Sequence, residues 1–350
     1  MRKFVSLCVV CILFLFSCDD LPENECILNS NQTFQGYAIS PEGHPEDFSK
    51  LIQFYEFTQQ QENASVMIGA SWRESLENSG DIPQSFLAFA SQANQFCFMP
   101  VWTMGWYSEG TALLDHPNNE ANNSWTNTFT KTAFETMILS FVNQVRPAYL
   151  FVSNEDDFYY EDQPNDHQNW VNFYHTLYDQ IKNISPNTQV GVTFQYEHIS
   201  GKGILNGWNV QNWTAFERYN PDKIDIYGFT VYPFFAHPNV EAIPSNYLDE
   251  LFDHIGNKPY AITETGWPAQ SFDDFPTAWS ESEAQQASFA QMILSLTSGT
   301  PIDVLQWLYL YPLVDTCESC DTWKLFGSIS LYDENGAPRP AANVWLENLP

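Results

Sequence analysis

One pattern repeats along this chain from residue 34 onward: an apolar segment of strand length is followed by a longer segment with apolar residues at helical spacing. The apolar segments are 34–39, 65–71, 96–103, 147–154, 189–195, 224–232, 259–263 and 302–310. The helical segments are 46–61, 84–95, 128–145, 168–184, 245–256 and 281–297, with a short one at 211–219 and a closing one at 338–349. Eight strands that alternate with helices predict an α/β fold, a single (β/α)8 TIM barrel.

The same alternation occurs in doubly wound α/β sheets, but no glycine-rich phosphate loop follows the first apolar segment. No linker rich in Pro, Gly or Ser divides the chain, and no repeat of solenoid period is visible. We therefore predict that residues 31–350 form one TIM-barrel domain. Its active site would lie where the carboxyl ends of the strands meet.

The first residues predict an export signal that precedes the fold. A basic start at 1–3 is followed by an apolar run at 4–16, which is too short to span a bilayer as a permanent helix. The run ends in Ser17 and Cys18, and this ending resembles a bacterial lipoprotein signal. The resemblance implies that residues 1–17 are a signal peptide and that Cys18 is lipidated. An ordinary secretory peptide is the alternative.

Residues 18–30 would then be an acidic tether that follows the lipidated cysteine. Asp19 and Asp20 resemble the surface-export signal of Bacteroidetes lipoproteins. This implies a bacterial outer-membrane lipoprotein exposed on the cell surface. The lipid anchor would be its only contact with a membrane.

Composition narrows the possible partners. The 43 acidic residues against 13 basic ones give a net charge of -30, which argues against nucleic acid, because nucleic-acid binding depends on Lys and Arg at the phosphates. The 12 Trp and 17 Tyr suit a carbohydrate cleft, where flat rings stack on sugar faces. We expect a monomer whose partner is a polysaccharide or oligosaccharide substrate.

Cysteines and histidines give no metal pattern. Cys97 lies in an apolar segment and is expected to be a plain core residue, whereas Cys317 and Cys320 could close a small disulfide loop. A zinc site would need a second ligand pair at suitable spacing, and none is evident. The histidines are scattered without a metal-ligand spacing. We predict no metal and no cofactor.

Two apolar runs end in a carboxylate. Residues 151–155 read Phe-Val-Ser-Asn-Glu, and residues 262–268 read Ile-Thr-Glu-Thr-Gly-Trp-Pro. The carboxylates are Glu155 and Glu264, which the barrel would bring to one mouth. Two carboxylates are what a glycosidase needs, because one protonates the leaving oxygen and the other attacks the anomeric carbon or activates water. Each could instead be an ordinary surface glutamate at a strand end.

These segments resemble a known group of enzymes. Asn154-Glu155 on the fourth strand, with a second glutamate on the seventh, resembles the retaining glycoside hydrolases of clan A. Residues 263–268 and 231–236 are similar to strand ends of family 17, the endo-β-1,3-glucanases, and family 53 endo-β-galactanases have comparable ones. The tail at 327–340 resembles the last barrel loop of such enzymes.

The resemblance implies roles for single residues. Glu155 would be the general acid/base and Glu264 the nucleophile. Asn154 would bind the sugar 2-hydroxyl, although it could be a turn residue. Tyr232 would orient the nucleophile, although it could belong to the barrel core. Of Asp156 and Asp157, which follow the acid/base, we expect at least one to face solvent.

Tryptophans near the strand ends are candidates for sugar platforms. Trp307, on the eighth strand, would form the floor of the subsite for the cleaved sugar. Trp102, Trp106 and Trp267 would form further platforms. For each of the four, packing in the barrel wall is the alternative.

These expectations combine into one function. The chain is predicted to be a retaining endo-β-glycosidase that cleaves internal β-linkages of a neutral polysaccharide. β-1,3-Glucan is the first substrate expected, followed by β-galactan or β-mannan. A transglycosylase would share the covalent intermediate, and a non-catalytic surface glycan-binding protein is the alternative from another class.

Overall fold

The structure is a computed structural model, and it describes residues 28–29, 31–73, 82–108, 113–114, 124–272, 277–314 and 321–347. The predicted signal peptide and the lipidated Cys18 lie outside the described residues, as do Cys317 and Cys320.

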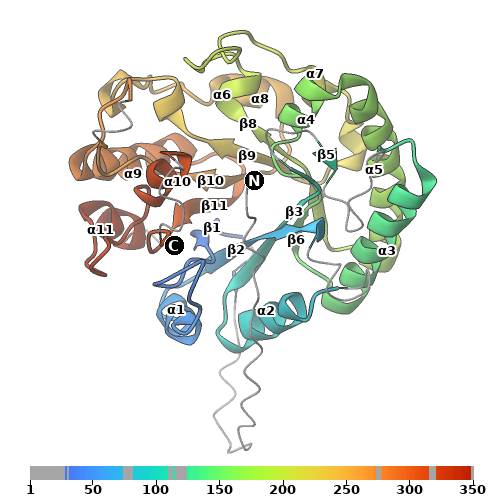
Figure 1. The fold of residues 1–350 in the computed structure, drawn as a ribbon, viewed down its shortest axis with the longest axis horizontal. Coiled ribbons are helices and arrows are strands. Elements are labelled where there is room, and N and C mark those ends of the chain that lie inside the picture. The colour runs from blue at the N-terminus through green and yellow to red at the C-terminus, as the bar shows by residue number, and fades with distance from the viewer. Residues whose placement is uncertain are drawn as a thin grey trace, which may run out of the picture.

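A parallel β-barrel forms the centre of the molecule (Figure 1). Its strands are β1 (Phe34–Ala38), β2 (Ala64–Ser71), β3 (Met99–Gly105), β6 (Tyr149–Phe151), β7 (Gln189–Gly191), β8 (Thr193–Gln195), β9 (Tyr227–Val231), β10 (Tyr260–Thr265) and β11 (Ile302–Tyr309). The hydrogen-bonded order is β7-β6-β3-β2-β1-β11-β10-β9-β8. The predicted TIM barrel is confirmed.

The barrel closes through the predicted strand at 189–195, which divides into β7 and β8. Gly191 of β7 pairs with Phe151 of β6, whereas Thr193 of β8 pairs with Gly228 of β9. Only Val192 separates the two short strands. The two ends of the sheet are thus neighbours along the chain.

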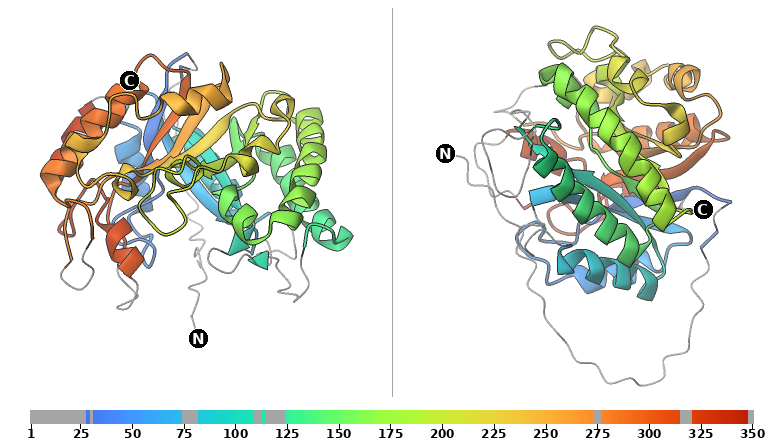
Figure 2. Two further views of the ribbon diagram at one scale, coloured as in Figure 1. Left: turned by 90° about the horizontal axis from the view of Figure 1, so that it is seen from above. Right: turned by 90° about the vertical axis from the view of Figure 1, so that its right-hand side faces the viewer.

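Helices surround the barrel (Figures 1 and 2). They are α1 (Leu51–Thr58), α2 (Gln84–Gln95), α3 (Thr128–Val145), α4 (Asp156–Asp162), α5 (Pro164–Ile184), α6 (Tyr196–Ile199), α7 (Thr214–Glu217), α8 (Asp249–Ile255), α9 (Glu283–Thr297), α10 (Asp321–Gly327) and α11 (Pro340–Glu347). Short 3-10 turns are η2 (Pro221–Lys223), η3 (Pro233–Phe235) and η4 (Val240–Ala242). A small hairpin joins β4 (Tyr107–Ser108) to β5 (Leu113–Leu114).

Helix ends follow local sequence signals. Asn127 caps α3 by accepting from the Phe129 N–H, and Ser282 caps α9 by accepting from the Gln285 N–H. Pro164 begins α5, where its missing N–H costs nothing. The short helices α4, α6 and α10 were not predicted, because they are too brief to show helical periodicity.

The barrel interior holds its own small apolar core. Its members are Phe34, Ala38, Met67, Val101, Tyr149, Phe151, Ile226, Ala261 and Val304. Gly191 and Gly228 make room for the ring of Phe151, since a Cβ on either would lie about 3 Å or less from that ring. A larger, aromatic-rich core fills the layer between strands and helices.

Cys97 requires a correction, because it is not a plain core residue. It lies in the turn before β3 with φ 52° and is half-buried. It takes part in a disulfide, and its partner lies outside the described residues.

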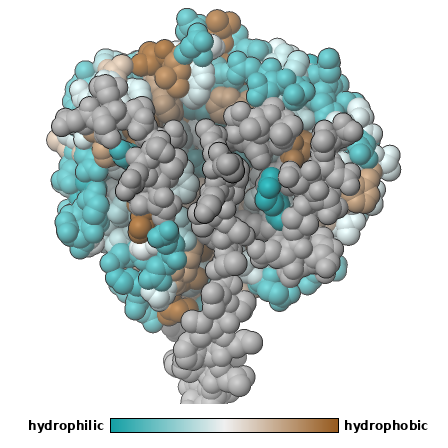
Figure 3. All heavy atoms as spheres, viewed as in Figure 1, coloured by the Kyte–Doolittle hydropathy of each residue, from teal (hydrophilic) through white to brown (hydrophobic). Residues whose placement is uncertain are grey.

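Where described residues are visible in Figure 3, they are mostly hydrophilic, with apolar residues in separate patches. No helix in the described part of the chain is long and apolar enough to cross a membrane.

Candidate active site

Glu155 and Glu264 stand at the carboxyl ends of two barrel strands, β6 and β10. Glu155 follows β6 and is the residue before α4, whereas Glu264 is part of β10. Both side chains are half-buried. Because the strands are parallel, both glutamates lie at the same mouth.

Strand β9 connects the two carboxylates. The Thr230 hydroxyl donates to Oε1 of Glu155 at 2.6 Å, and the Tyr232 hydroxyl donates to Oε2 of Glu264 at 2.9 Å. Thr230 and Tyr232 are two positions apart, so they lie on the same face of the chain about 7 Å apart along the strand. The structure therefore brings Glu155 and Glu264 together over one short stretch of backbone.

A register shift determines which way Glu264 points. Ala261 faces the barrel interior, so strict alternation would turn Glu264 outward. Against β9, however, Ile262 pairs with Phe229 and Glu264 pairs with Thr230, and Thr263 is passed over. This irregularity returns Glu264 to the inner face, opposite Thr230.

Glu155 has an unusual backbone conformation. Its φ of 45° and ψ of 54° are left-handed, which is uncommon for a residue with a side chain. Its N–H donates to Oγ1 of Thr193 at 2.8 Å, and its carbonyl accepts from the Tyr107 hydroxyl at 2.7 Å. The Thr193 hydroxyl also lies 3.0 Å from Oδ1 of the half-buried Asn154. Thr193 thus positions both residues of the Asn-Glu pair.

Tyr232 is a dedicated hydrogen-bond donor. Burial raises the pKa of Tyr232 well above its usual range, and the Glu264 and Glu155 carboxylates raise it further. The phenol therefore stays protonated and can always donate to Glu264. Its backbone N–H donates to Oε2 of Glu197 at 2.9 Å.

Glu197 is a buried carboxylate that sequence reasoning missed. It also accepts from the Tyr247 hydroxyl at 2.8 Å and from Nε2 of Gln195 at 2.7 Å. Burial raises the pKa of Glu197, against the effect of these donors. Thr230 was missed too, although its spacing of two from Tyr232 was a usable signal.

Asp156 and Asp157 require a correction, because neither faces solvent. Their exposed fractions are 0% and 2%. Each contacts a histidine: Oδ2 of Asp156 lies 2.5 Å from Nε2 of His167, and Oδ2 of Asp157 lies 2.6 Å from Nδ1 of His198. Helix α4 is packed on both sides. The two consecutive acidic residues did not indicate this packing.

The four candidate tryptophans lie away from the mouth. Each has an exposed fraction of 0%. Their ring partners include Phe89 of α2 for Trp102, Trp170 of α5 for Trp106, Phe289 of α9 for Trp267, and Trp345 of α11 for Trp307. The structure places all four in the barrel wall, facing the helices, rather than where a sugar could stack on them.

Tyr309 takes the place at the mouth that was expected for Trp307. Along the pairing of β1 with β11, Tyr37 pairs with Trp307 and Ala38 pairs with Tyr309, so Leu308 is passed over. Tyr309 is half-buried and packs against the interior core. Its ring also lies 5.2 Å from that of His44.

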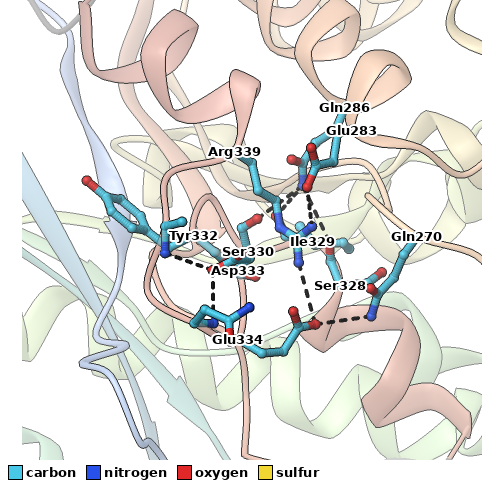
Figure 4. A network of polar contacts seen from close by, with 12 residues as sticks. Gln270, Glu283, Gln286, Ser328, Ile329, Ser330, Tyr332, Asp333, Glu334 and Arg339 are labelled. Carbon is cyan, nitrogen blue, oxygen red and sulfur yellow. Dashed lines mark hydrogen bonds and ion pairs between the residues drawn. The ribbon is translucent and has the colours of Figure 1, made fainter.

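The last loop, residues 327–340, is held by side chains of α9 (Figure 4). The buried amide of Gln286 donates to the Ile329 carbonyl at 2.9 Å, and Arg339 pairs with Glu283 at 2.9 Å. Ile329 packs so closely on Gly266 that a Cβ there would lie 2.0 Å from it. A glycine two residues after Glu264 is therefore a packing requirement.

No group of three or more His, Cys, Asp or Glu that could hold a metal occurs among the residues that the structure describes. The side chains that meet at the barrel mouth carry two carboxylates, a phenol and a threonine hydroxyl.

Solved structures with a similar fold include glycoside hydrolases. An exo-β-1,4-mannosidase from Opitutaceae bacterium strain TAV5 is 11% identical with a TM-score of 0.67, and the match covers 90% of this chain and 58% of that chain. A GH5_18 protein from Bifidobacterium longum subsp. longum, in complex with Manβ1-4GlcNAc, is 12% identical with a TM-score of 0.64, covering 90% and 77%. A family 39 glycoside hydrolase from Bacteroides cellulosilyticus WH2 is 14% identical with a TM-score of 0.60, covering 91% and 65%.

These likenesses establish the fold. The chain spans 58% of the length of the mannosidase. No protein-family model matches the sequence, and no curated protein matches it.

Proposed function

We propose that this protein is a retaining β-glycosidase in which Glu264 is the nucleophile and Glu155 is the general acid/base. One observation carries the proposal: the two carboxylates at the barrel mouth are bonded to Thr230 of β9 and to Tyr232, which directly follows that strand. Carboxyl groups that meet over so short a stretch suit a double displacement, which needs a separation of roughly 5–5.5 Å.

The mechanism follows from these positions. Glu264 attacks the anomeric carbon while Glu155 protonates the departing oxygen, and a covalent glycosyl-enzyme forms. Glu155 then takes a proton from the water that releases the sugar with retained configuration. Tyr232 holds the nucleophile through its hydroxyl, and Tyr309 offers an aromatic surface at the mouth. Asn154 is placed beside Glu155 to bind a sugar hydroxyl.

The test is substitution of each glutamate by its amide. Glu155→Gln and Glu264→Gln should each remove most turnover on the best polysaccharide and leave the melting temperature within a few degrees of wild type. Azide should restore activity to Glu264→Ala and yield a glycosyl azide of inverted configuration. Near-wild-type turnover of either amide variant would refute the assignment.

Two indications bear on the identity of the glycan. The resemblance of residues 263–268 to family 17 points to a β-1,3-glucan, whereas two of the similar structures bear names that refer to β-mannosides. We propose a neutral β-linked glycan and an endo mode of cleavage. Laminarin, β-1,4-galactan and β-1,4-mannan, assayed together with sizing of the products, separate these substrates and distinguish hydrolysis from transfer. Binding of a glycan without any cleavage would favour the non-catalytic alternative.

We also propose that the mature protein is a surface lipoprotein anchored through Cys18. The lipoprotein-like ending of the apolar run at 4–16 supports this. Cys18→Ala should abolish lipid labelling and release the protein from the membrane fraction, because lipid attachment requires that thiol. Continued labelling of this variant would contradict the anchor.

A further inference from the structure

Helix α4 begins directly after Glu155, so whatever holds this helix also sets the direction of the Glu155 side chain. The left-handed conformation of Glu155 is sparsely populated, and such residues persist only where the surrounding structure fixes them. The helix has seven residues, too few to be stable by itself. Its position must therefore come from tertiary contacts.

Asp156 supplies the contacts on one side of α4. Its Oδ2 accepts from the Tyr219 hydroxyl at 2.7 Å and from Nε2 of His167, and its Oδ1 accepts from the Ser153 hydroxyl at 3.0 Å. Nη1 of Arg218 lies 3.3 Å from Nδ1 of His167. Since a guanidinium can only donate, Nδ1 accepts and the ring proton sits on Nε2, which faces Asp156.

Asp157 supplies the contacts on the other side. Its Oδ1 accepts from the Gln195 N–H at 2.9 Å, at the end of β8. Its Oδ2 pairs with Nδ1 of His198, whose ring stacks on Phe158 with centroids 4.8 Å apart. Asp157 thus ties α4 to β8 and α6, while Asp156 ties it to α5 and to the segment at 218–219.

We propose that Asp156 and Asp157 are positioning residues that clamp α4 from both sides and hold Glu155 where its carboxylate meets Thr230. The inference rests on the proposed role of Glu155 as general acid/base. Proton transfer by Glu155 then depends on two buried aspartates that do not themselves exchange protons with the substrate.

The dependence of kcat/KM on the leaving group measures the position of Glu155, and general damage to the fold would not change this dependence. A phenyl glycoside needs protonation of the departing oxygen, whereas 2,4-dinitrophenolate departs without it. A displaced Glu155 therefore lowers kcat/KM for the phenyl glycoside and spares the dinitrophenyl glycoside. The ratio of the two values is independent of the fraction of folded protein, and kcat/KM covers only binding and the step that forms the covalent intermediate.

The experiment measures this ratio for Asp156→Asn and Asp157→Asn. The substrates are phenyl and 2,4-dinitrophenyl β-D-glucopyranoside, or the two β-D-mannopyranosides if wild type prefers them. Glu155→Gln is the positive reference, and Asp162→Asn, an exposed aspartate on the same helix, is the matched control. If Asp156→Asn does not fold, His198→Gln replaces it, because that change removes the partner of Asp157.

We expect the ratio to fall about tenfold or more in the two clamp variants, at most by the 10²–10⁴ that general acid–base catalysis typically contributes. The Asp162→Asn ratio should match wild type. An unchanged ratio in the clamp variants, or an equal loss on both substrates, overturns the inference. If Glu155→Gln itself leaves the ratio unchanged, the proposed function fails and the inference fails with it.

Discussion

Substitution of Trp307 distinguishes packing in the barrel wall from contact with the sugar. Its side chain is fully buried, its ring contacts Trp345 with centroids 5.1 Å apart, and its Nε1 donates to the Ile329 carbonyl at 2.7 Å. Truncating a buried tryptophan to alanine typically costs about 3–5 kcal/mol. The Ile329 carbonyl keeps the Gln286 amide as a partner, so little is added for a lost hydrogen bond.

We therefore expect Trp307→Ala to lower the free energy of unfolding by about 4 kcal/mol, which for a domain of this size is a fall in melting temperature of about 6 °C. Turnover per folded molecule should stay within about twofold of wild type, because the ring does not reach the mouth. Trp307→Phe is the matched control: it keeps one aromatic ring and loses the smaller ring of the indole together with its N–H, at a cost of about 1–2 kcal/mol.

The assay combines urea unfolding with steady-state kinetics on one preparation, in which active molecules are counted by trapping the covalent intermediate with a 2-deoxy-2-fluoro glycoside. A large loss of kcat/KM at an unchanged melting temperature would refute the reasoning. It would mean that Trp307 contacts the sugar.

Three further predictions concern other parts of the fold. Burial lowers the pKa of His44 to about 4, so between the ordinary value of about 6.5 and 4 only the unfolded chain binds the proton. Protonation of this residue in the unfolded chain should lower the free energy of unfolding of wild type by about 3 kcal/mol as pH falls from 7 to 4. In His44→Gln, urea unfolding should show a decrease over the same range that is smaller by this amount. Thr230→Val removes a donor to the Glu155 carboxylate, so the basic limb of the kcat/KM profile should move to higher pH by up to about one unit; a shift to lower pH would count against the contact. Peptide mapping without reductant should join Cys97 to Cys26, because Leu28 and Met99 pack against the same interior core; a link to Cys317 or Cys320 would contradict this.

The sequence by itself determined the architecture and the two carboxylates. Apolar segments of strand length alternate with helical ones, and this alternation depends on local periodicity, which survives in any tertiary context. The ranges expected for α2 and α3 agree with the structure at both ends. Glu155 and Glu264 were found because a carboxylate that ends an apolar run lies at a strand end, whatever surrounds it.

Tertiary structure alone decided which side chains face the barrel mouth. The direction of a strand residue depends on the pairing register, and one passed-over residue reverses every direction beyond it. Passing over Thr263 turns Glu264 inward, and passing over Leu308 turns Tyr309 toward the mouth. Neither shift has a local signature.

The partners of the carboxylates were likewise decided by the fold. Asp156 and Asp157 look like solvated charges in the sequence, yet each is buried against a histidine of another helix. Glu197 reaches the backbone of Tyr232 only because β8 and β9 are adjacent in the closed barrel. Burial and hydrogen-bond satisfaction are properties of the packed chain, so the residues that hold a site in place cannot be deduced from the order of amino acids alone.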